Sequence, residues 1–176
     1  GMFGYTDFFN QEIGDWDVSS VTSMESMFKS SDFNKNISGW DLSNLINMKS
    51  MFESSKFNQP IGDWDVSSVT DMSWLFYKNS VFNQPIGNWN VSAVTTMESS
   101  FYNATSFNQP IGNWNVSKVE QMNGMFRGSS FNQDLSGWDV SSVILMDYMF
   151  SYSSFNKPIG NWDVSSVREI NHMFYQ

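Results

Sequence analysis

Residues 107–126 read FNQPIGNWNVSKVEQMNGMF, and variants of this stretch fill the chain. A tryptophan marks each copy, and successive tryptophans lie 24 or 25 residues apart: Trp16, Trp40, Trp64, Trp89, Trp114, Trp138 and Trp162. A fixed period of about 20–50 residues indicates stacked repeats, each too small to bury a core without its neighbours. The sequence therefore predicts a single array of seven repeats over residues 1–176, and not a globular domain built around a catalytic pocket.

Both ends of the chain fall at the same point of the repeat. The chain begins with Met2-Phe3 and stops shortly after Met173-Phe174, and neither end shows an atypical capping repeat. We therefore expect an excerpt of a longer protein, with Gly1 left as a scar of tag removal. Uncapped repeats of this kind are expected to promote end-to-end self-association.

The second half of each repeat has apolar residues at helical spacing. In the first copy they fall at i, i+3, i+6 and i+7, which is one stripe of a short helix: Val21, Met24, Met27 and Phe28. A serine precedes this stripe by two residues in every copy, where its hydroxyl would cap the first turn. These serines are Ser19, Ser43, Ser67, Ser92, Ser117, Ser141 and Ser165.

Upstream of the stripe, Trp16-Asp17-Val18 alternates apolar and polar residues, as a short strand does when one face is buried. Stacking would align such strands in a narrow parallel ladder and place the short helices on the opposite side. The predicted fold class is therefore α/β: a leucine-rich-repeat-like solenoid with a short parallel strand and a short helix in each of about seven repeats.

Two rows of polar residues recur at fixed positions. The asparagine of each Phe-Asn pair is predicted to bond the backbone of its own and the adjacent coil: Asn10, Asn34, Asn58, Asn83, Asn108, Asn132 and Asn156. The residue after each tryptophan points away from the core by strand alternation and forms an Asx ladder: Asp17, Asp41, Asp65, Asn90, Asn115, Asp139 and Asp163. Bonds to local backbone are the first interpretation of the Asx ladder. Calcium binding by pairs such as Asp15 with Asp17, or Asp63 with Asp65, is the alternative.

Charge and composition argue against several kinds of partner. The 18 acidic residues outnumber the 9 basic ones, which gives a formal net charge of −9, and no row of Lys or Arg could neutralise a phosphate backbone. No apolar run of about 18 residues could span a bilayer. Neither nucleic acid nor direct membrane insertion is therefore expected. Because the chain has no cysteine, it offers no thiolate and no Cys-based zinc site, and no cofactor is predicted.

Catalysis is not expected either. The seven recurrent serines share one histidine, His172, and therefore cannot form seven Ser-His-Asp triads. Repetition supplies rows of acids but no unique pair that converges on a cleft, which a polysaccharide hydrolase would require.

The unit resembles a known family. The stretch FNQPIGNW at residues 107–114, together with the later Met-Phe pair, is similar to the BspA-like leucine-rich-repeat surface proteins of bacteria, in particular their shorter-repeat branch, the domain of unknown function 285 type. The resemblance covers essentially the whole chain. It implies a secreted, cell-wall-anchored or lipid-anchored protein on the bacterial surface, with a role in adhesion or host interaction. It brings no catalytic residues with it.

Function is sought where the repeats differ, because identical positions are explained by the fold. Aromatic residues occupy variable positions near the closing Phe of several repeats (Phe28 in the first), where other copies are small or polar: Trp74, Tyr77, Tyr102, Tyr148 and Tyr152. Exposed aromatics offer a large rigid contact area and predict binding of an extracellular protein or glycan. The alternative for Trp74 is that it only covers a neighbouring helix.

Two functions from different classes follow from these observations. The first is a non-catalytic surface binding or adhesion module that recognises a host or neighbouring-cell protein or glycan. The second is a structural spacer that projects another domain, its repeats selected only for stacking.

Overall fold

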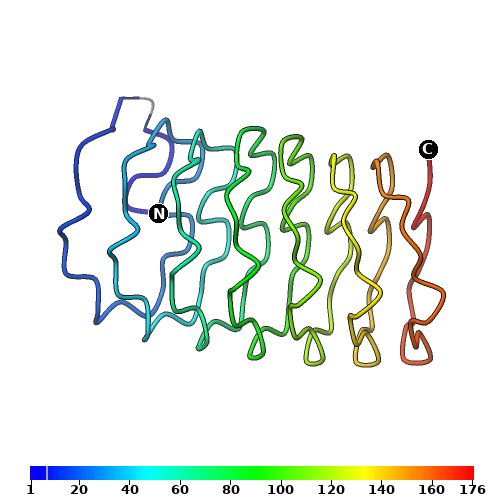
Figure 1. Ribbon diagram of the computed structural model, residues 1–176. Coiled ribbons are helices and arrows are strands. Elements are labelled where there is room, and N and C mark those ends of the chain that lie inside the picture. The colour runs from blue at the N-terminus through cyan, green and yellow to red at the C-terminus, as the bar shows by residue number, and fades with distance from the viewer. Residues whose placement is uncertain (7) are drawn as a thin grey trace.

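The computed structural model describes residues 1–6 and 8–176 as one stack of coils, in which each repeat makes one turn around a common core (Figure 1). The coils follow one another in chain order, from the blue N-terminal end to the red C-terminal end. We number the repeats from their Phe-Asn pairs, so repeats 1 to 7 span residues 9–32, 33–56, 57–81, 82–106, 107–130, 131–154 and 155–176. The chain is therefore a repeat protein, as its period predicts.

The α/β class predicted for these repeats is wrong. Within residues 1–6 and 8–176 there is no helix and no extended strand, and the regular pairing consists of six isolated parallel bridges. Each bridge joins one residue to its equivalent in the next repeat: Ser23 to Asn47, Asn47 to Asp71, Asp71 to Thr96, Thr96 to Gln121, Gln121 to Leu145 and Leu145 to Glu169. The bridges lie in the segment predicted as a helix, whereas the predicted strand Trp16-Asp17-Val18 lies among turns.

The segment predicted as a helix is a hydrogen-bonded ladder between coils. Every second N–H group points along the stack and donates to a carbonyl of the next repeat, so it is not available for the i to i−4 bond of a helix. In repeat 1 these bonds measure 2.7–2.9 Å and join Met24 to Asn47, Ser26 to Lys49, Phe28 to Met51 and Ser30 to Glu53. We call residues 22–30, and the equivalent residues of the other repeats, the ladder segments.

Left-handed backbone conformations explain why no helix forms. In the ladder segments the residues two before and two after the closing Phe have φ between 51° and 67°: Ser26, Ser30, Ser50, Ser54, Trp74, Lys78, Ser99, Asn103, Gly124, Gly128, Tyr148, Tyr152 and His172. Left-handed residues interrupt a right-handed helix. Short turns, such as the 3.1 Å bond from the N–H of Met27 to the carbonyl of Met24, close the chain between them.

Columns of stacked aromatic rings form the core. Ring centroids of closing phenylalanines in adjacent coils lie 5.6–5.9 Å apart, and those of the Phe-Asn phenylalanines lie 6.1–6.5 Å apart. Tryptophans that stack on each other in neighbouring coils are 6.3–6.4 Å apart. The rings are therefore most closely spaced in the column of closing phenylalanines, next to the ladder segments.

Each tryptophan from repeat 2 onwards ties its coil to the preceding one. The indole Nε1 donates to a main-chain carbonyl of the previous repeat at 2.9–3.1 Å: Trp40 to Ile13, Trp64 to Ile37, Trp89 to Ile61, Trp114 to Ile86, Trp138 to Ile111 and Trp162 to Leu135. These bonds satisfy a buried donor that would otherwise destabilise the core.

Within residues 1–6 and 8–176, no helix has the length and apolar character needed to cross a membrane.

The recurrent polar residues serve turns and neighbouring coils. The serines do not cap helices as predicted, because their N–H groups donate to the preceding Asx side chain, as from Ser19 to Asp17 at 3.0 Å. The asparagine ladder is confirmed: Oδ1 of Asn10 accepts the N–H of Asn34 at 3.0 Å, and the same bond recurs along the stack up to Asn156.

Candidate binding face

The ladder segments present one continuous row of surface side chains, which we call the ladder face. It consists of the positions five, three and two residues before the closing Phe and the positions one and two residues after it. The closing Phe itself and the residue before it point inwards in most repeats and are buried, as Phe52 and Met51 are. The ladder face is therefore where the repeats differ in sequence while sharing one backbone.

Three of the predicted aromatic residues adjoin one another on this face. Trp74 and Tyr77 of repeat 3 have ring centroids 6.4 Å apart, and Tyr77 stacks on Tyr102 of repeat 4 at 4.6 Å and 15°. Two lysines lie over these rings, with Nζ of Lys49 5.3 Å from the Trp74 ring centroid and Nζ of Lys78 5.2 Å from that of Tyr77. All three aromatic side chains are only half-buried, so their rings remain available to a partner.

Arg127 of repeat 5 connects these rings to the other two predicted aromatics. Its guanidinium carbon lies 5.6 Å from the ring centroid of Tyr102, 4.9 Å from that of Tyr148 and 6.0 Å from that of Tyr152. Sequence reasoning missed Arg127, although it directly follows a closing Phe, as Tyr77 does. We call the six connected residues the aromatic cluster: Trp74, Tyr77, Tyr102, Arg127, Tyr148 and Tyr152.

The backbone under this cluster does not require aromatic residues. Trp74 and Tyr148 occupy the left-handed position two before the closing Phe, with φ of 58° and 55°. Left-handed backbone costs a non-glycine residue about 1–2 kcal/mol, and bulky residues are rare there. Gly124 holds the same position in repeat 5 without that cost. The rings of Trp74 and Tyr148 therefore stand on a backbone conformation that favours glycine.

A hollow of about 530 Å³ lies beside the cluster, across repeats 4 to 7. Its floor includes Ser99 and Gly124, which have small side chains where Trp74 and Tyr148 have rings. The full lining is Ser99, Tyr102, Asn123, Gly124, Arg127, Leu145, Asp147, Tyr148, Glu169, Asn171 and His172. The hollow thus combines two tyrosine rings and a guanidinium group with several amide and carboxylate groups.

Two polar groups in this hollow have spare hydrogen-bonding capacity. Oδ1 of Asn123 is buried and accepts no hydrogen bond from the described residues. Oδ1 of Asp147 accepts the N–H of Asn171 at 2.6 Å, which leaves its second oxygen for another donor. Within the part of the chain that the structure describes, Arg127 has no carboxylate in ion-pair contact.

The Asx ladder serves its own backbone. In every repeat, Oδ1 of the residue after the tryptophan accepts the N–H of the serine two residues later, at 3.0–3.2 Å. Hydrogen bonds from the hydroxyl and backbone of Ser141 lower the pKa of Asp139, and the other aspartates of this ladder behave alike: Asp17, Asp41, Asp65 and Asp163. The local-backbone interpretation is therefore the one that these contacts support.

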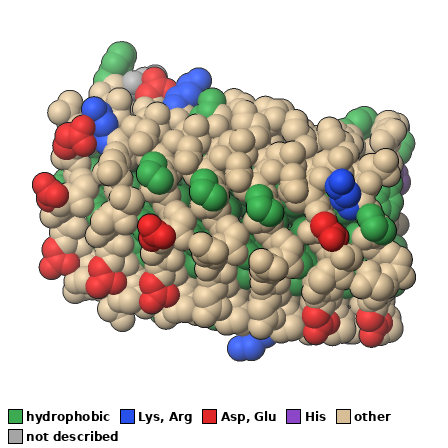
Figure 2. Space-filling view, viewed as in Figure 1, with side chains coloured by type: hydrophobic (Ala, Val, Ile, Leu, Met, Phe, Trp, Pro, Cys, Tyr) green, Lys and Arg blue, Asp and Glu red, His purple; other side chains and the backbone are tan. Residues whose placement is uncertain are grey.

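The geometry offers no support for calcium at the Asx ladder. Within residues 1–6 and 8–176, no group of three His, Cys, Asp or Glu side chains is placed to hold a metal ion. In the pair of Asp15 and Asp17, Oδ1 of Asp17 also accepts both the N–H and the hydroxyl of Ser19. In the view of Figure 2, most acidic side chains lie near the margins and a few lie within the face, on a largely uncharged polar surface that also carries a row of hydrophobic side chains.

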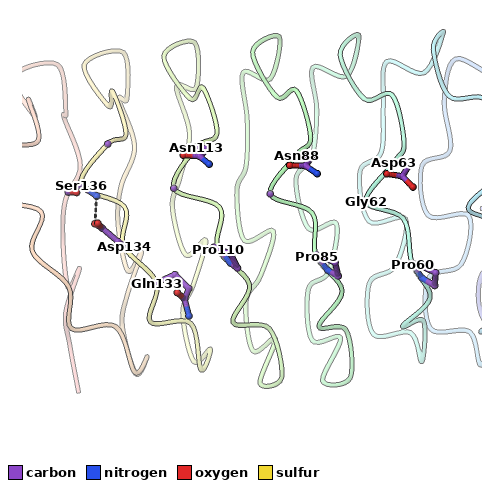
Figure 3. Close-up of a pocket in the computed structure, with 13 residues that line it drawn as sticks. Pro60, Gly62, Asp63, Pro85, Asn88, Pro110, Asn113, Gln133, Asp134 and Ser136 are labelled. Carbon is purple, nitrogen blue, oxygen red and sulfur yellow. Dashed lines mark hydrogen bonds between the residues drawn. The ribbon is translucent and has the colours of Figure 1, made fainter.

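A second hollow, of about 710 Å³, lies on another face of repeats 3 to 6 (Figure 3). Pro60, Pro85 and Pro110 form one row on neighbouring coils, and a second row contains Asp63, Asn88 and Asn113. Proline and glycine recur at the same positions in repeats 3 to 5, where they shape the turn before each tryptophan, whereas repeat 6 has Asp134 and Ser136 there. This hollow is therefore explained largely by the recurrent turn, unlike the ladder face.

These features define a solenoid repeat protein with one face on which variable side chains gather. The chain belongs to the family described as Mycoplasma protein of unknown function, DUF285, whose profile matches residues 1–73, 31–130 and 108–176. The overlapping matches confirm the resemblance to the domain of unknown function 285 type. No match was found among curated proteins or among solved structures.

Proposed function

We propose that the chain is a non-catalytic binding module of the bacterial cell surface, and that its ladder face recognises an extracellular protein or glycan. One observation carries this proposal. The five variable aromatics, far apart in the sequence, form with Arg127 a single cluster beside a hollow. A pure spacer has no reason to place large rings at Trp74 and Tyr148, where glycine fits the left-handed backbone better and most other repeats have small residues.

The surface location is part of the same proposal. Its support is the resemblance of the repeat to bacterial surface proteins. The net charge of −9 and the absence of a basic row disfavour nucleic acid as the partner. The fixed residues of each repeat are occupied by ring stacking, Trp–carbonyl bonds and Asx turns, which leaves the ladder face as the surface free to diverge.

The test is a binding screen of the purified chain against a glycan array and against immobilised fibronectin, laminin and collagen. We expect specific binding that a Trp74→Ala/Tyr102→Ala double variant loses. Asn88→Ala, an exposed change on the proline-lined face, is the matched control and should bind normally. Absence of binding throughout, or equal loss in the control, would favour the spacer.

A further inference from the structure

Resting on the proposed function, we infer that the 530 Å³ hollow on the ladder face, which Tyr102, Arg127 and Tyr148 line, is a subsite for an uncharged pyranose sugar. Its volume falls within the range of about 300–1,000 Å³ that is usual for small-molecule sites. It lies in the middle of the aromatic cluster, since Tyr102, Arg127 and Tyr148 line it. A ring-shaped ligand that enters it meets aromatic surface from two different repeats.

Gly124 opens the hollow. It occupies the column that holds Trp74 in repeat 3 and Tyr148 in repeat 6, and its left-handed φ of 63° matches theirs. A Cβ at position 124 would lie 3.0 Å from Oγ of Ser99 and 4.0 Å from Cδ2 of Tyr102, so a large side chain there would extend into the hollow that these residues line. Together with Ser99 of repeat 4, the glycine therefore leaves a gap two coils wide between Trp74 and Tyr148 in this column.

Arg127 sets the two tyrosine rings in position and supplies donors. Its guanidinium group lies between the rings of Tyr102 and Tyr148, at 5.6 Å and 4.9 Å. Cation–π contacts of this kind hold the group against the ring faces while its N–H edge stays able to donate. With no carboxylate in ion-pair contact among the described residues, those N–H groups are available to hydroxyl oxygens.

The acceptors line the same hollow as Arg127. Oδ1 of Asn123 is buried without a hydrogen-bond partner among the described residues, Asp147 accepts one backbone N–H through Oδ1 and has a second carboxylate oxygen, and Glu169 is exposed. Sugar hydroxyls both donate and accept, and the C–H faces of a pyranose ring pack on aromatic rings. A site that offers rings, donors and acceptors within one hollow matches that chemistry.

The charges select against other ligands. The hollow is lined by two carboxylates, Asp147 and Glu169, against one guanidinium group, Arg127, in a chain of net charge −9, so sulfated or carboxylated sugars meet a surplus of like charge. An apolar peptide side chain would leave the acceptors of Asn123 and Asp147 unpaired, which is unfavourable for binding. An uncharged sugar avoids both penalties.

Trp74 and Tyr77 extend the site for longer chains. Trp74 and Tyr148 occupy the same column three coils apart, about 14 Å at the usual spacing of about 4.8 Å between paired chains. The stacked pair of Tyr77 and Tyr102 bridges part of this interval. A linear oligosaccharide that starts in the hollow could therefore also contact the Trp74 ring.

The experiment is isothermal titration of the full chain with lactose, maltose, cellobiose, N,N′-diacetylchitobiose and, as the charged comparison, sialyllactose. We expect at least one uncharged disaccharide to bind. Gly124→Trp, which fills the hollow with a residue that Trp74 shows the column accepts, should weaken that binding at least about tenfold. Tyr148→Ala should weaken it similarly, and Asn88→Ala, the matched control, should leave it unchanged.

Circular dichroism and urea midpoints establish that each variant is folded. Longer oligomers of the bound sugar should gain affinity in the parent chain, and Trp74→Ala should remove that gain without altering disaccharide binding. The inference is overturned if no uncharged disaccharide binds, if sialyllactose alone binds, or if binding survives Gly124→Trp. If a matrix protein binds through Trp74 and Tyr102 while no sugar binds, this inference fails and the proposed function stands. If no probe binds at all, both fail.

Discussion

Replacing Trp114 by phenylalanine tests whether the indole bonds hold the coils together. Trp114 is 4% exposed, its Nε1 donates to the carbonyl of Ile86 at 3.1 Å, and its ring stacks on that of Trp89 at 6.3 Å. Because the Ile86 carbonyl also accepts the N–H of Trp89, the variant loses one bond but does not leave that oxygen unpaired. The lost hydrogen bond is worth about 1 kcal/mol. The smaller ring forfeits about 1–2 kcal/mol more in burial and stacking.

The expected loss is therefore about 2–3 kcal/mol in the free energy of unfolding, measured by urea titration with circular dichroism as the probe. Trp16→Phe is the matched control, since Trp16 is the equivalent residue of repeat 1 and is 42% exposed. It should lose at most about 1 kcal/mol. If both variants shifted the urea midpoint equally, the ladder of indole bonds would not be a source of stability.

Three further results are expected. Gly87→Ala would place a Cβ 2.5 Å from the carbonyl oxygen of Pro110 in the next coil, so it should lower the free energy of unfolding by about 1–3 kcal/mol in a urea titration. Gly160 occupies the same position of its repeat but has open space around it, so Gly160→Ala should leave that free energy unchanged. Hydrogen bonds from Ser141 lower the folded-state pKa of Asp139, so their stabilisation is complete above the ordinary aspartate pKa of about 4 and is lost as the pH falls through the lower folded-state value. Asp139→Asn should therefore show a shallower fall of urea midpoint between pH 5 and pH 2, and an unchanged profile would contradict this. The melting temperature should be the same in EDTA and in millimolar Ca²⁺; a calcium-dependent rise would revive the metal site at the Asx ladder.

The repeat and most of its inward residues could be predicted from the sequence. Trp64, Val66 and Met72 are buried as their regular recurrence indicated, and the predicted asparagine ladder is present. These predictions succeed because they depend only on period and polarity, which a stacked array translates directly into columns.

The helix was wrong for a physical reason. The spacing of Val21, Met24, Met27 and Phe28 fits a helix, but stacked coils supply acceptors for every second N–H group, and the backbone takes left-handed φ at serine to reach them. Serine does not signal such a conformation, so tertiary context overrides the local pattern. Two glycines were the available hint: Gly124 within the predicted stripe of repeat 5, and Gly128 two residues after its closing Phe.

The sequence indicated which positions of the candidate face vary, but not which of their side chains contact one another. Trp74 and Tyr148 stand out in any alignment of the repeats, yet only the coil geometry shows that Arg127 lies between Tyr102 and Tyr148. The position of Arg127, one residue after a closing Phe, predicts that it lies in the same column as Tyr77 and Tyr102, but it does not predict the contact of Arg127 with the ring of Tyr148.

Because the period is fixed, equivalent positions along the ladder face are separated by whole multiples of the spacing between coils. A group on one repeat can approach a group on another only in whole coil steps, so side-chain substitutions change what is displayed but hardly where it is displayed. Deleting residues 107–130 as one complete repeat would keep the stacking rules, remove Gly124 and Arg127 together, and bring Tyr102 and Tyr148 one step closer. Gain or loss of whole repeats would thus reset the spacing of such a surface in a single event, which no point mutation can do.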